Sequence, residues 1–226
     1  MGSIPSESTR SRRDRSTKPD TFFLPLSYEH AAICHALETM TFPPAECATL
    51  EKFQYRLAKC PELCMGMFIN SEEAAKLGGL ARQLQFDSHV VKRRFLIGQI
   101  SATKTTDATV TEAAMASPRP KDHIAGGHRP EGRTVCIHAV AVAPEFQMLG
   151  LGRRMLTAYV QHLKQKDMAH RVAILAHAHL LGYYESFGFV NMGLSKNPYG
   201  NGGWYDMILD LHSSTAAAAA VAASQL

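Results

Sequence analysis

Runs of apolar residues along this chain follow two periods, and each period predicts a different kind of element. Short apolar runs predict strands at residues 21–25, 63–69, 94–103, 134–142, 171–176, 189–192 and 203–211. Apolar positions spaced for one helix face predict helices from Ser27 to about Met40 and over residues 45–59, 151–166 and 179–187. This order of elements predicts an α/β chain in which helices cover the faces of one mixed central sheet.

The spacing of these elements predicts one domain between two tails. Residues 1–20 are polar, basic and rich in Ser, Arg and Pro, and we expect them to form a disordered tail. The domain covers residues 21–212, and within it residues 104–133 are rich in Pro and Gly and predict a long mobile insertion. Residues 213–226 form a low-complexity tail rich in Ala, which is helical if ordered.

Charge and composition exclude several classes of protein. The 226 residues carry a formal net charge of +4, and five basic against three acidic residues in the first twenty supply +2 of it. The domain is therefore close to neutral, and we do not expect it to bind nucleic acid. No apolar run approaches the roughly twenty residues that span a bilayer, and the start of the chain lacks a secretory h-region. Five cysteines without a C-x-x-C pair predict reduced thiols, no zinc site and a cytoplasmic location.

A loop with two glycines joins the strand at residues 134–142 to the helix that follows it. The loop reads Q-x-x-G-x-G from Gln147 to Gly152, and the free backbone N–H groups at a helix start favour an anion. Gly150 and Gly152 carry no Cβ, so the backbone can approach a pyrophosphate closely. The loop lacks the Lys-Ser/Thr pair of a Walker A sequence and the third glycine of the dinucleotide-binding motif. The residues alone leave two interpretations open, a phosphate-binding loop and a plain glycine turn.

The Q-x-x-G-x-G run resembles the acyl-CoA pyrophosphate loop of the GNAT superfamily of N-acetyltransferases. Three further segments resemble blocks of the arylalkylamine (serotonin-type) N-acetyltransferases: residues 60–68 (C-P-E-L-C-M-G-M-F), 137–142 (I-H-A-V-A-V) and 181–189 (L-G-Y-Y-E-S-F-G-F). The resemblance extends from about Phe22 to Leu211, with residues 104–133 as an insertion, and residues 202–207 (G-G-W-Y-D-M) are similar to fungal-type members. It implies the GNAT acyl-CoA N-acyltransferase fold.

The resemblance implies a direct transfer of the acetyl group from acetyl-CoA to a small primary amine within a ternary complex. Such a transfer needs a base for the amine and an acid for the departing thiolate. Tyr184 matches the position of the family's general acid. His138 matches the second of two strand histidines that relay a proton, and Cys136 replaces the first. Either His138 acts with water, or the base is Glu38 at the end of the first helix, although Tyr184 and His138 could also be core residues.

The resemblance also implies where the two substrates lie. Backbone groups of the strand would contact the pantetheine arm, and the glycine loop would hold the pyrophosphate. The residues concerned are Val140, Ala141, Val142, Gln147, Met148, Leu149, Gly150, Leu151, Gly152 and Arg153. An aromatic ring on the amine would contact Phe42, Pro43, Leu63, Met65 and the loop at residues 192–204. No metal is expected, because the strand-to-helix spacing points His177 and His179 in unrelated directions.

The acceptor amine and the role of the tails stay open at this stage. Serotonin, tryptamine or phenethylamine is the first expectation, and the alternatives are polyamines, peptide amines or a catalytically idle acyl-CoA-binding module. Basic residues before Ser16 and Thr17 resemble a kinase site, and a phosphate there would recruit a 14-3-3-type partner. Gly2 fits a loose myristoylation pattern, and the peptide Ser224-Gln225-Leu226 differs in one residue from a peroxisomal signal. We expect no stable membrane association.

Overall fold

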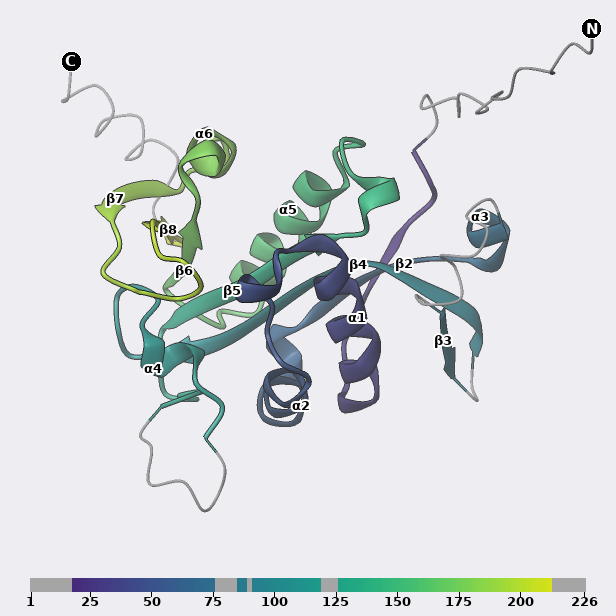
Figure 1. The fold of residues 1–226 in the computed structure, drawn as a ribbon, viewed down its shortest axis with the longest axis horizontal. Coiled ribbons are helices and arrows are strands. Elements are labelled where there is room, and N and C mark those ends of the chain that lie inside the picture. Colours follow the sequence, from purple (N-terminus) through teal and green to yellow (C-terminus); the bar gives the residue numbers. More distant parts are fainter. Residues whose placement is uncertain (1–17, 76–84, 89–90, 119–125, 213–226) are drawn as a thin grey trace, which may run out of the picture.

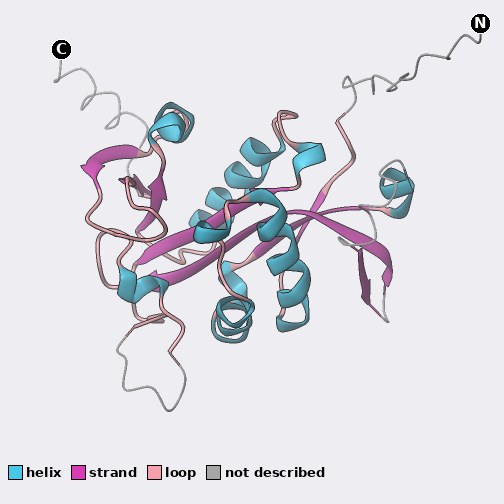
Figure 2. Ribbon diagram, viewed as in Figure 1, coloured by secondary structure: helices cyan, strands magenta, loops and turns pink. Residues whose placement is uncertain are grey.

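A computed structural model describes residues 18–75, 85–88, 91–118 and 126–212 of the chain, and its centre is an eight-stranded sheet (Figures 1 and 2). The strands are β1 (Phe22–Pro25), β2 (Met65–Ile69), β3 (Gln85–Ser88), β4 (Val91–Thr105), β5 (Thr134–Val142), β6 (Arg171–Ala176), β7 (Val190–Leu194) and β8 (Tyr205–Asp210). Seven strands follow the order β1-β2-β4-β5-β6-β8-β7, and β3 pairs with β4. Only β5 and β6 pair in parallel. The mixed sheet expected from the sequence is confirmed.

Helices cover both faces of the sheet (Figure 1). The longer helices are α1 (Ala31–Thr41), α2 (Leu50–Lys59) and α5 (Leu151–Gln165), and the short ones are α3 (Ser71–Ala75), α4 (Glu112–Met115) and α6 (Leu181–Glu185). Helices α1 and α2 lie on one face of β4 and β5, and α5 lies on the other. Single 3-10 turns complete the chain: η1 (Tyr28–His30), η2 (Pro44–Glu46), η3 (Pro61–Leu63), η5 (Pro144–Phe146) and η6 (Ala178–Leu180).

The apolar faces of these elements meet in one main core. Phe53 of α2, Phe68 of β2 and Tyr159 of α5 are among its largest fully buried side chains. The hydroxyl of Tyr159 donates a hydrogen bond to the carbonyl of Leu63, 2.9 Å away, so the one polar atom of this ring is satisfied inside the core. No helix in the described part of the chain is both long and apolar enough to span a bilayer.

Two stretches differ from the pattern that the sequence predicts. The helix expected over residues 45–59 is divided into η2 and α2, because Thr49 caps a new helix by accepting a bond from the N–H of Lys52. The insertion expected at residues 104–133 contains α4, and both Val110 and Met115 from this stretch are buried in a second, smaller core. Residues 119–125 of it lie outside the described residues.

Several sequence-based expectations concern residues that the structure does not describe. The basic tail up to residue 17, with Gly2, Ser16 and Thr17, lies outside the described residues. The Ala-rich tail at residues 213–226, with the terminal Ser-Gln-Leu, does so as well.

Candidate active site

The sheet opens between β5 and β6. The two strands pair only from Thr134 opposite Arg171 to Ile137 opposite Ile174, whereas β5 continues to Val142 and stays paired with β4 on its other side. A register shift places a bulge at His138, so Ser101 faces Ala139 and Ala102 faces Ile137. From His138 onward, the edge of β5 that faces β6 carries no strand in the described part of the sheet. Backbone N–H and C=O groups of this edge are therefore suited to bind an extended arm.

The glycine loop lies at the end of this edge, between η5 and α5. Gly150 is the N-cap of α5 and has φ of 75°, a left-handed conformation that glycine adopts without strain. The first N–H groups of α5, on Leu151, Gly152 and Arg153, have no carbonyl partner within the helix. The loop residue Met148 has φ of 62° and is 94% exposed. An exposed loop with free N–H groups at the start of a 15-residue helix fits an anionic phosphate.

Side chains around the loop are not all placed as the sequence suggests. The guanidinium of Arg153 donates to Ser186 Oγ at 2.8 Å and lies over the rings of Phe187 and Tyr183, so it is held against α6. Gln147 donates from Nε2 to the carbonyl of Val142 at 3.0 Å and so occupies the last acceptor of β5. A cation that the motif did not reveal is Lys18, whose Nζ lies 3.6 Å from the position that a Cβ on Gly150 would take.

A cavity of about 360 Å³ adjoins the open edge of β5. Five of the residues expected to act in catalysis or to contact a substrate line it: Phe42, Pro43, His138, Val140 and Tyr184. The loop at residues 192–204, expected to contact the ring of the amine, lines it through Tyr199 and Trp204. Most of its remaining wall is apolar or aromatic and comes from Val110, Met115, Ile137, Ala139, Ile174, Leu175, Leu180, Tyr199 and Trp204. A cavity of this size with few polar groups is suited to a small organic molecule.

Two residues expected to contact the ring of the amine lie elsewhere. Leu63 is fully buried in η3, and Met65 belongs to β2, which β4 separates from β5. Neither is among the described residues that line the cavity. The family-like segment at residues 60–68 therefore contributes to the main core rather than to the cavity. In this core the carbonyl of Leu63 accepts the hydrogen bond of the Tyr159 hydroxyl.

Tyr184 lies on α6, where the cavity meets the opening between β5 and β6. Its side chain is 9% exposed and packs edge-on against Phe189, with ring centroids 5.7 Å apart. Burial raises the pKa of Tyr184 above that of a free phenol, so the hydroxyl keeps its proton at neutral pH. This hydroxyl is the only phenol of the α6 pair, Tyr183 and Tyr184, that lines the cavity in the described structure.

His138 lines the cavity as a neutral ring. Burial lowers its pKa well below the ordinary histidine value, and the positive charges of Arg56 and Lys52 lower it further. Nε2 lies 2.8 Å from Oγ1 of Thr103, whose hydroxyl donates to the carbonyl of Ala114 at 3.1 Å. The hydroxyl has one proton, so His138 donates from Nε2 and keeps a lone pair on Nδ1. Nδ1 is buried and has no hydrogen-bond partner among the described residues.

Cys136 shares the α4 side of β5 with His138, as the period of the strand predicts. It packs with Val110, Ala114 and Met115. Burial raises the pKa of the Cys136 thiol to about 12, so the thiol is protonated at neutral pH and is a poor acceptor in a proton relay.

Glu38 lies on the last turn of α1. It is 2% exposed, and Oε1 accepts a hydrogen bond from the N–H of Ala48 at 2.5 Å. Burial raises the pKa of Glu38 to about 7, against the opposing effects of this bond and of Arg56 and Lys52. Oε2 has no described partner, and Glu38 is not among the described residues that line the cavity.

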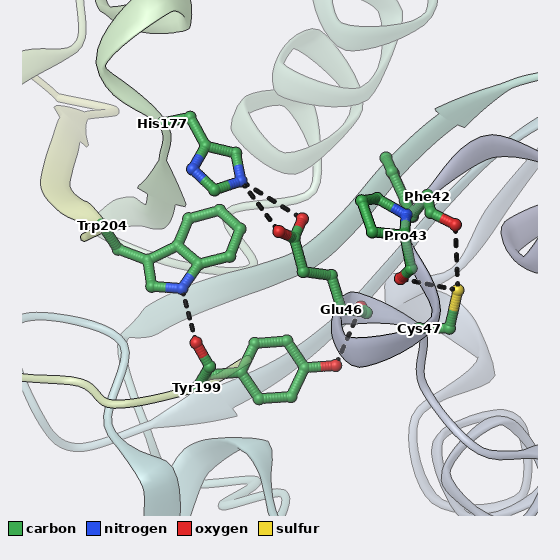
Figure 3. Close-up of polar contacts among 7 residues, drawn as sticks. All are labelled: Phe42, Pro43, Glu46, Cys47, His177, Tyr199 and Trp204. Carbon is green, nitrogen blue, oxygen red and sulfur yellow. Dashed lines mark hydrogen bonds and ion pairs between the residues drawn. The ribbon is translucent and has the colours of Figure 1, made fainter. Parts of the chain in front are cut away.

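Sequence reasoning missed a polar pair in the cavity wall. Glu46 of η2 and His177, directly after β6, meet with Nε2 3.2 Å from each carboxylate oxygen (Figure 3). The imidazole stacks on the indole of Trp204 with centroids 3.9 Å apart. The rings of His177 and His179 lie nearly parallel at 14°, contrary to the expectation of unrelated directions. No set of three His, Cys, Asp or Glu side chains suited to hold a metal ion occurs among the described residues.

The arrangement has the parts that acyl transfer to an amine needs. An anion site at the start of α5 leads along the free edge of β5 to a cavity with a protonated phenol and a neutral imidazole. The open edge and the anion site together fit the long pantetheine arm and the phosphates of coenzyme A. These groups belong to different elements, so only the fold brings them together.

Comparison with known proteins gives one family and a group of named relatives. The family model described as "Acetyltransferase (GNAT) domain" matches residues 72–206. Serotonin N-acetyltransferase of Mesocricetus auratus is 24% identical over 204 residues, which cover 79% of this chain and 82% of that protein. Serotonin N-acetyltransferase of Macaca mulatta is 28% identical over 182 residues, with 79% and 73% covered.

Solved structures share the fold at low identity. The loading GNATL domain of CurA from Lyngbya majuscula superposes with a TM-score of 0.60 at 14% identity, and the alignment covers 85% of this chain and 98% of that domain. Such a likeness concerns the arrangement of helices and strands, and it agrees with the mixed sheet described above.

Proposed function

The chain belongs to the GNAT family of acetyl-CoA-dependent acetyltransferases, and we propose that its acceptor is a small primary arylalkylamine of the serotonin, tryptamine or phenethylamine type. The observation that carries this proposal is the cavity at the open edge of β5, whose wall is mainly apolar and aromatic and which contains both Tyr184 and His138. An aryl ring fits such a wall, because its burial removes apolar surface from water. The relatives named serotonin N-acetyltransferase support the same acceptor class.

Coenzyme A binds, in this proposal, by its phosphates at the start of α5 and by its pantetheine arm along Val140, Ala141 and Val142. The N–H groups of Leu151, Gly152 and Arg153 face the pyrophosphate. The ammonium of Lys18 beside Gly150 adds a positive charge to the loop. The guanidinium of Arg153 stays on Ser186, so Arg153 contributes its backbone rather than its side chain.

The acceptor first loses its ammonium proton to solvent, and His138 then accepts the second proton, which the neutral amine gives up as it attacks the acetyl carbon. A neutral imidazole with a lowered pKa is a weak base, but the proton of an amine becomes far more acidic as the nitrogen bonds to the acetyl carbon. Tyr184 then donates its proton to the departing thiolate, a role for which the phenol is fully protonated. Glu38 is not among the described residues of the cavity wall, so it has no contact with the acceptor in this scheme.

Three alternative functions explain less of the cavity. A polyamine carries several positive charges, whereas Glu46 is the only carboxylate among the described residues of the wall. An idle acyl-CoA-binding module would not need a protonated phenol and a neutral imidazole in the wall of one cavity. A peptide amine would need room for the rest of its chain beside the reacting nitrogen.

Thiol release from acetyl-CoA with a panel of amines tests the proposal. We expect phenethylamine and tryptamine to give a higher kcat/KM than spermidine or a peptide N-terminus. A preference for spermidine or the peptide would overturn the acceptor class, and heat of acetyl-CoA binding without thiol release on any amine would favour the idle module.

Four further features of the chain stand as proposals. The catalytic domain covers residues 21–212, because β1 pairs with β2 at one edge of the same sheet. We place the protein in the cytoplasm and among the fungal-type members of the family. A phosphate on Ser16 or Thr17 recruits a 14-3-3-type partner, and a phosphosite map with both positions unmodified would remove that proposal.

A further inference from the structure

The wall of the acceptor cavity is mainly apolar, but it contains one acidic side chain. Glu46 is its one carboxylate, and no Lys or Arg occurs among the described residues of the wall. His138 adds no positive charge, because burial keeps this imidazole neutral. Primary alkylamines have a pKa of about 10 and arrive as cations at neutral pH. The carboxylate of Glu46 is therefore opposite in charge to the protonated acceptor, and the imidazoles of His177 and His179 are the other basic side chains of the wall.

The turn that carries Glu46 is fixed on several sides (Figure 3). Its backbone carbonyl accepts a hydrogen bond from the Tyr199 hydroxyl at 2.9 Å, and its N–H donates to the carbonyl of Pro43 at 2.9 Å. The neighbouring Cys47 thiol donates to the carbonyls of Phe42 and Pro43 at 3.5 and 3.4 Å. The backbone of Glu46 is thus fixed before any ligand binds, and the bond to His177 orients its carboxylate, which lowers the cost of recognition.

The carboxylate has room for a second donor. Nε2 of His177 brings one N–H to both oxygens, at 3.2 Å each, whereas an ionised carboxylate has about four acceptor positions. Beside it lie Trp204 and Tyr199, whose ring centroids are 6.5 Å apart and which both line the cavity. His177 covers one face of the indole, and the Lys52 ammonium lies over the Tyr199 ring at 5.3 Å. The carboxylate and the part of this aromatic wall that faces the cavity form one side of an ammonium site.

Resting on the proposed function, we infer that Glu46 receives the ammonium group of the acceptor and thereby selects amines over the amino acids that share their side chain. The α-carboxylate of an amino acid brings a second negative charge next to Glu46. Two like charges repel strongly where the surrounding walls have a low dielectric constant. An amine without this carboxylate is attracted to Glu46 through its ammonium group and has no charge that Glu46 repels.

Trp204 allows the inference to be tested without catalysis, because it is the only tryptophan of the chain and stacks on His177. Phenethylamine and phenylalanine are titrated while the fluorescence of Trp204 is recorded, with wild type, E46Q and the surface control E51Q. Loss of a hydrogen bond to a charged group should raise the dissociation constant of phenethylamine about tenfold or more in E46Q. Phenylalanine should bind wild type at least about tenfold more weakly than phenethylamine, and E46Q should narrow this gap.

A second pair of variants separates charge from shape. E46D and E46N have side chains of equal length, so only E46D should keep the preference for phenethylamine. An unchanged dissociation constant in E46Q, an equal preference in E46D and E46N, or no binding of phenethylamine to wild type would each overturn the inference. Failure of the proposed function has a different signature: the binding differences persist, but acetyl-CoA releases no thiol with phenethylamine.

Discussion

The hydroxyl of Thr103 on β4 lies 2.8 Å from Nε2 of His138 on β5 and determines which ring nitrogen can take a proton. Because Thr103 donates to the carbonyl of Ala114, it accepts from Nε2, and the lone pair of the imidazole is on Nδ1. Thr103 therefore acts through His138 as a positioning residue, in the way that a partner of one imidazole nitrogen orients the other.

Replacing Thr103 by Val keeps the shape of the side chain and removes the acceptor. We expect T103V to lower kcat about tenfold, with little change in the affinity for acetyl-CoA, because the imidazole loses its fixed tautomer. T105V, on the same strand, is the matched control. The effect should vanish in a His138→Gln background, and an equal loss in that background would show that Thr103 acts independently of His138.

Tyr184→Phe removes only the hydroxyl of the proposed acid. Loss of a general acid costs about 10² or more in turnover, so kcat should fall by that factor while calorimetry gives an unchanged affinity for coenzyme A. Tyr183→Phe is the control, since Tyr183 does not line the cavity in the described structure. Retained turnover in Tyr184→Phe would remove the hydroxyl from the mechanism.

The pH dependence of kcat distinguishes the two candidate bases. Burial places the pKa of His138 well below the usual value, so an imidazole base stays neutral and active down through pH 6.5. Burial raises the pKa of Glu38 to about 7, and a carboxylate base would lose activity as the pH falls through that value. We expect no such loss in wild type. A fall of kcat as the pH drops below 7 that is absent in Glu38→Gln would show that Glu38 is the base.

Glu38 also gives stability a defined pH dependence. Its pKa is raised in the folded state, so its contribution to stability is complete below the unfolded value of 4.5 and is lost as the pH rises to about 7. The ionised form then costs up to ~3 kcal/mol, which Glu38→Gln avoids. The free energy of unfolding of the variant, relative to wild type, should therefore be larger at pH 8 than at pH 4.5 in urea titrations. An equal difference at both pH values would contradict the raised pKa.

Lys18 should contribute to coenzyme A binding through charge alone. Its ammonium lies beside Gly150 at the anion site, and an exposed cation there should strengthen binding a few-fold at low salt. We expect Lys18→Ala to raise the dissociation constant of coenzyme A at about 20 mM salt. At about 0.5 M salt the variant and wild type should bind coenzyme A equally well. Lys59→Ala, at the exposed end of α2, is the control, and equal effects of both variants would contradict a local role.

The sequence predicts well whatever depends on local pattern. The strand at residues 134–142 and the helix that begins at Leu151 are confirmed to within one residue, because the apolar period and Gly150 act over a few neighbouring positions. The Pro and Gly content of residues 104–133 predicts a mobile insertion, whereas Val110 and Met115 of this stretch are buried against Cys136 and Ala173, which lie outside it in the sequence.

The polar part of the cavity could not be read from the sequence. Glu46 and His177 are 131 positions apart and belong to no motif, and their meeting depends on where η2 and the end of β6 lie in the fold. Leu63 and Met65 are the opposite case: as apolar side chains they are expected to contact the ring of the amine, but Leu63 is buried in η3, and Met65 lies in β2, which β4 separates from β5. A motif can mark residues needed for the reaction or residues needed for packing. Only the three-dimensional arrangement shows which of these two roles a residue has.

Thiol release from acetyl-CoA by the purified wild-type protein with phenethylamine tests the central claim most directly. We expect saturable release that matches the N-acetylphenethylamine formed and that falls about 10² or more in Tyr184→Phe. Absence of release with every arylalkylamine, under conditions where acetyl-CoA binds, would contradict it.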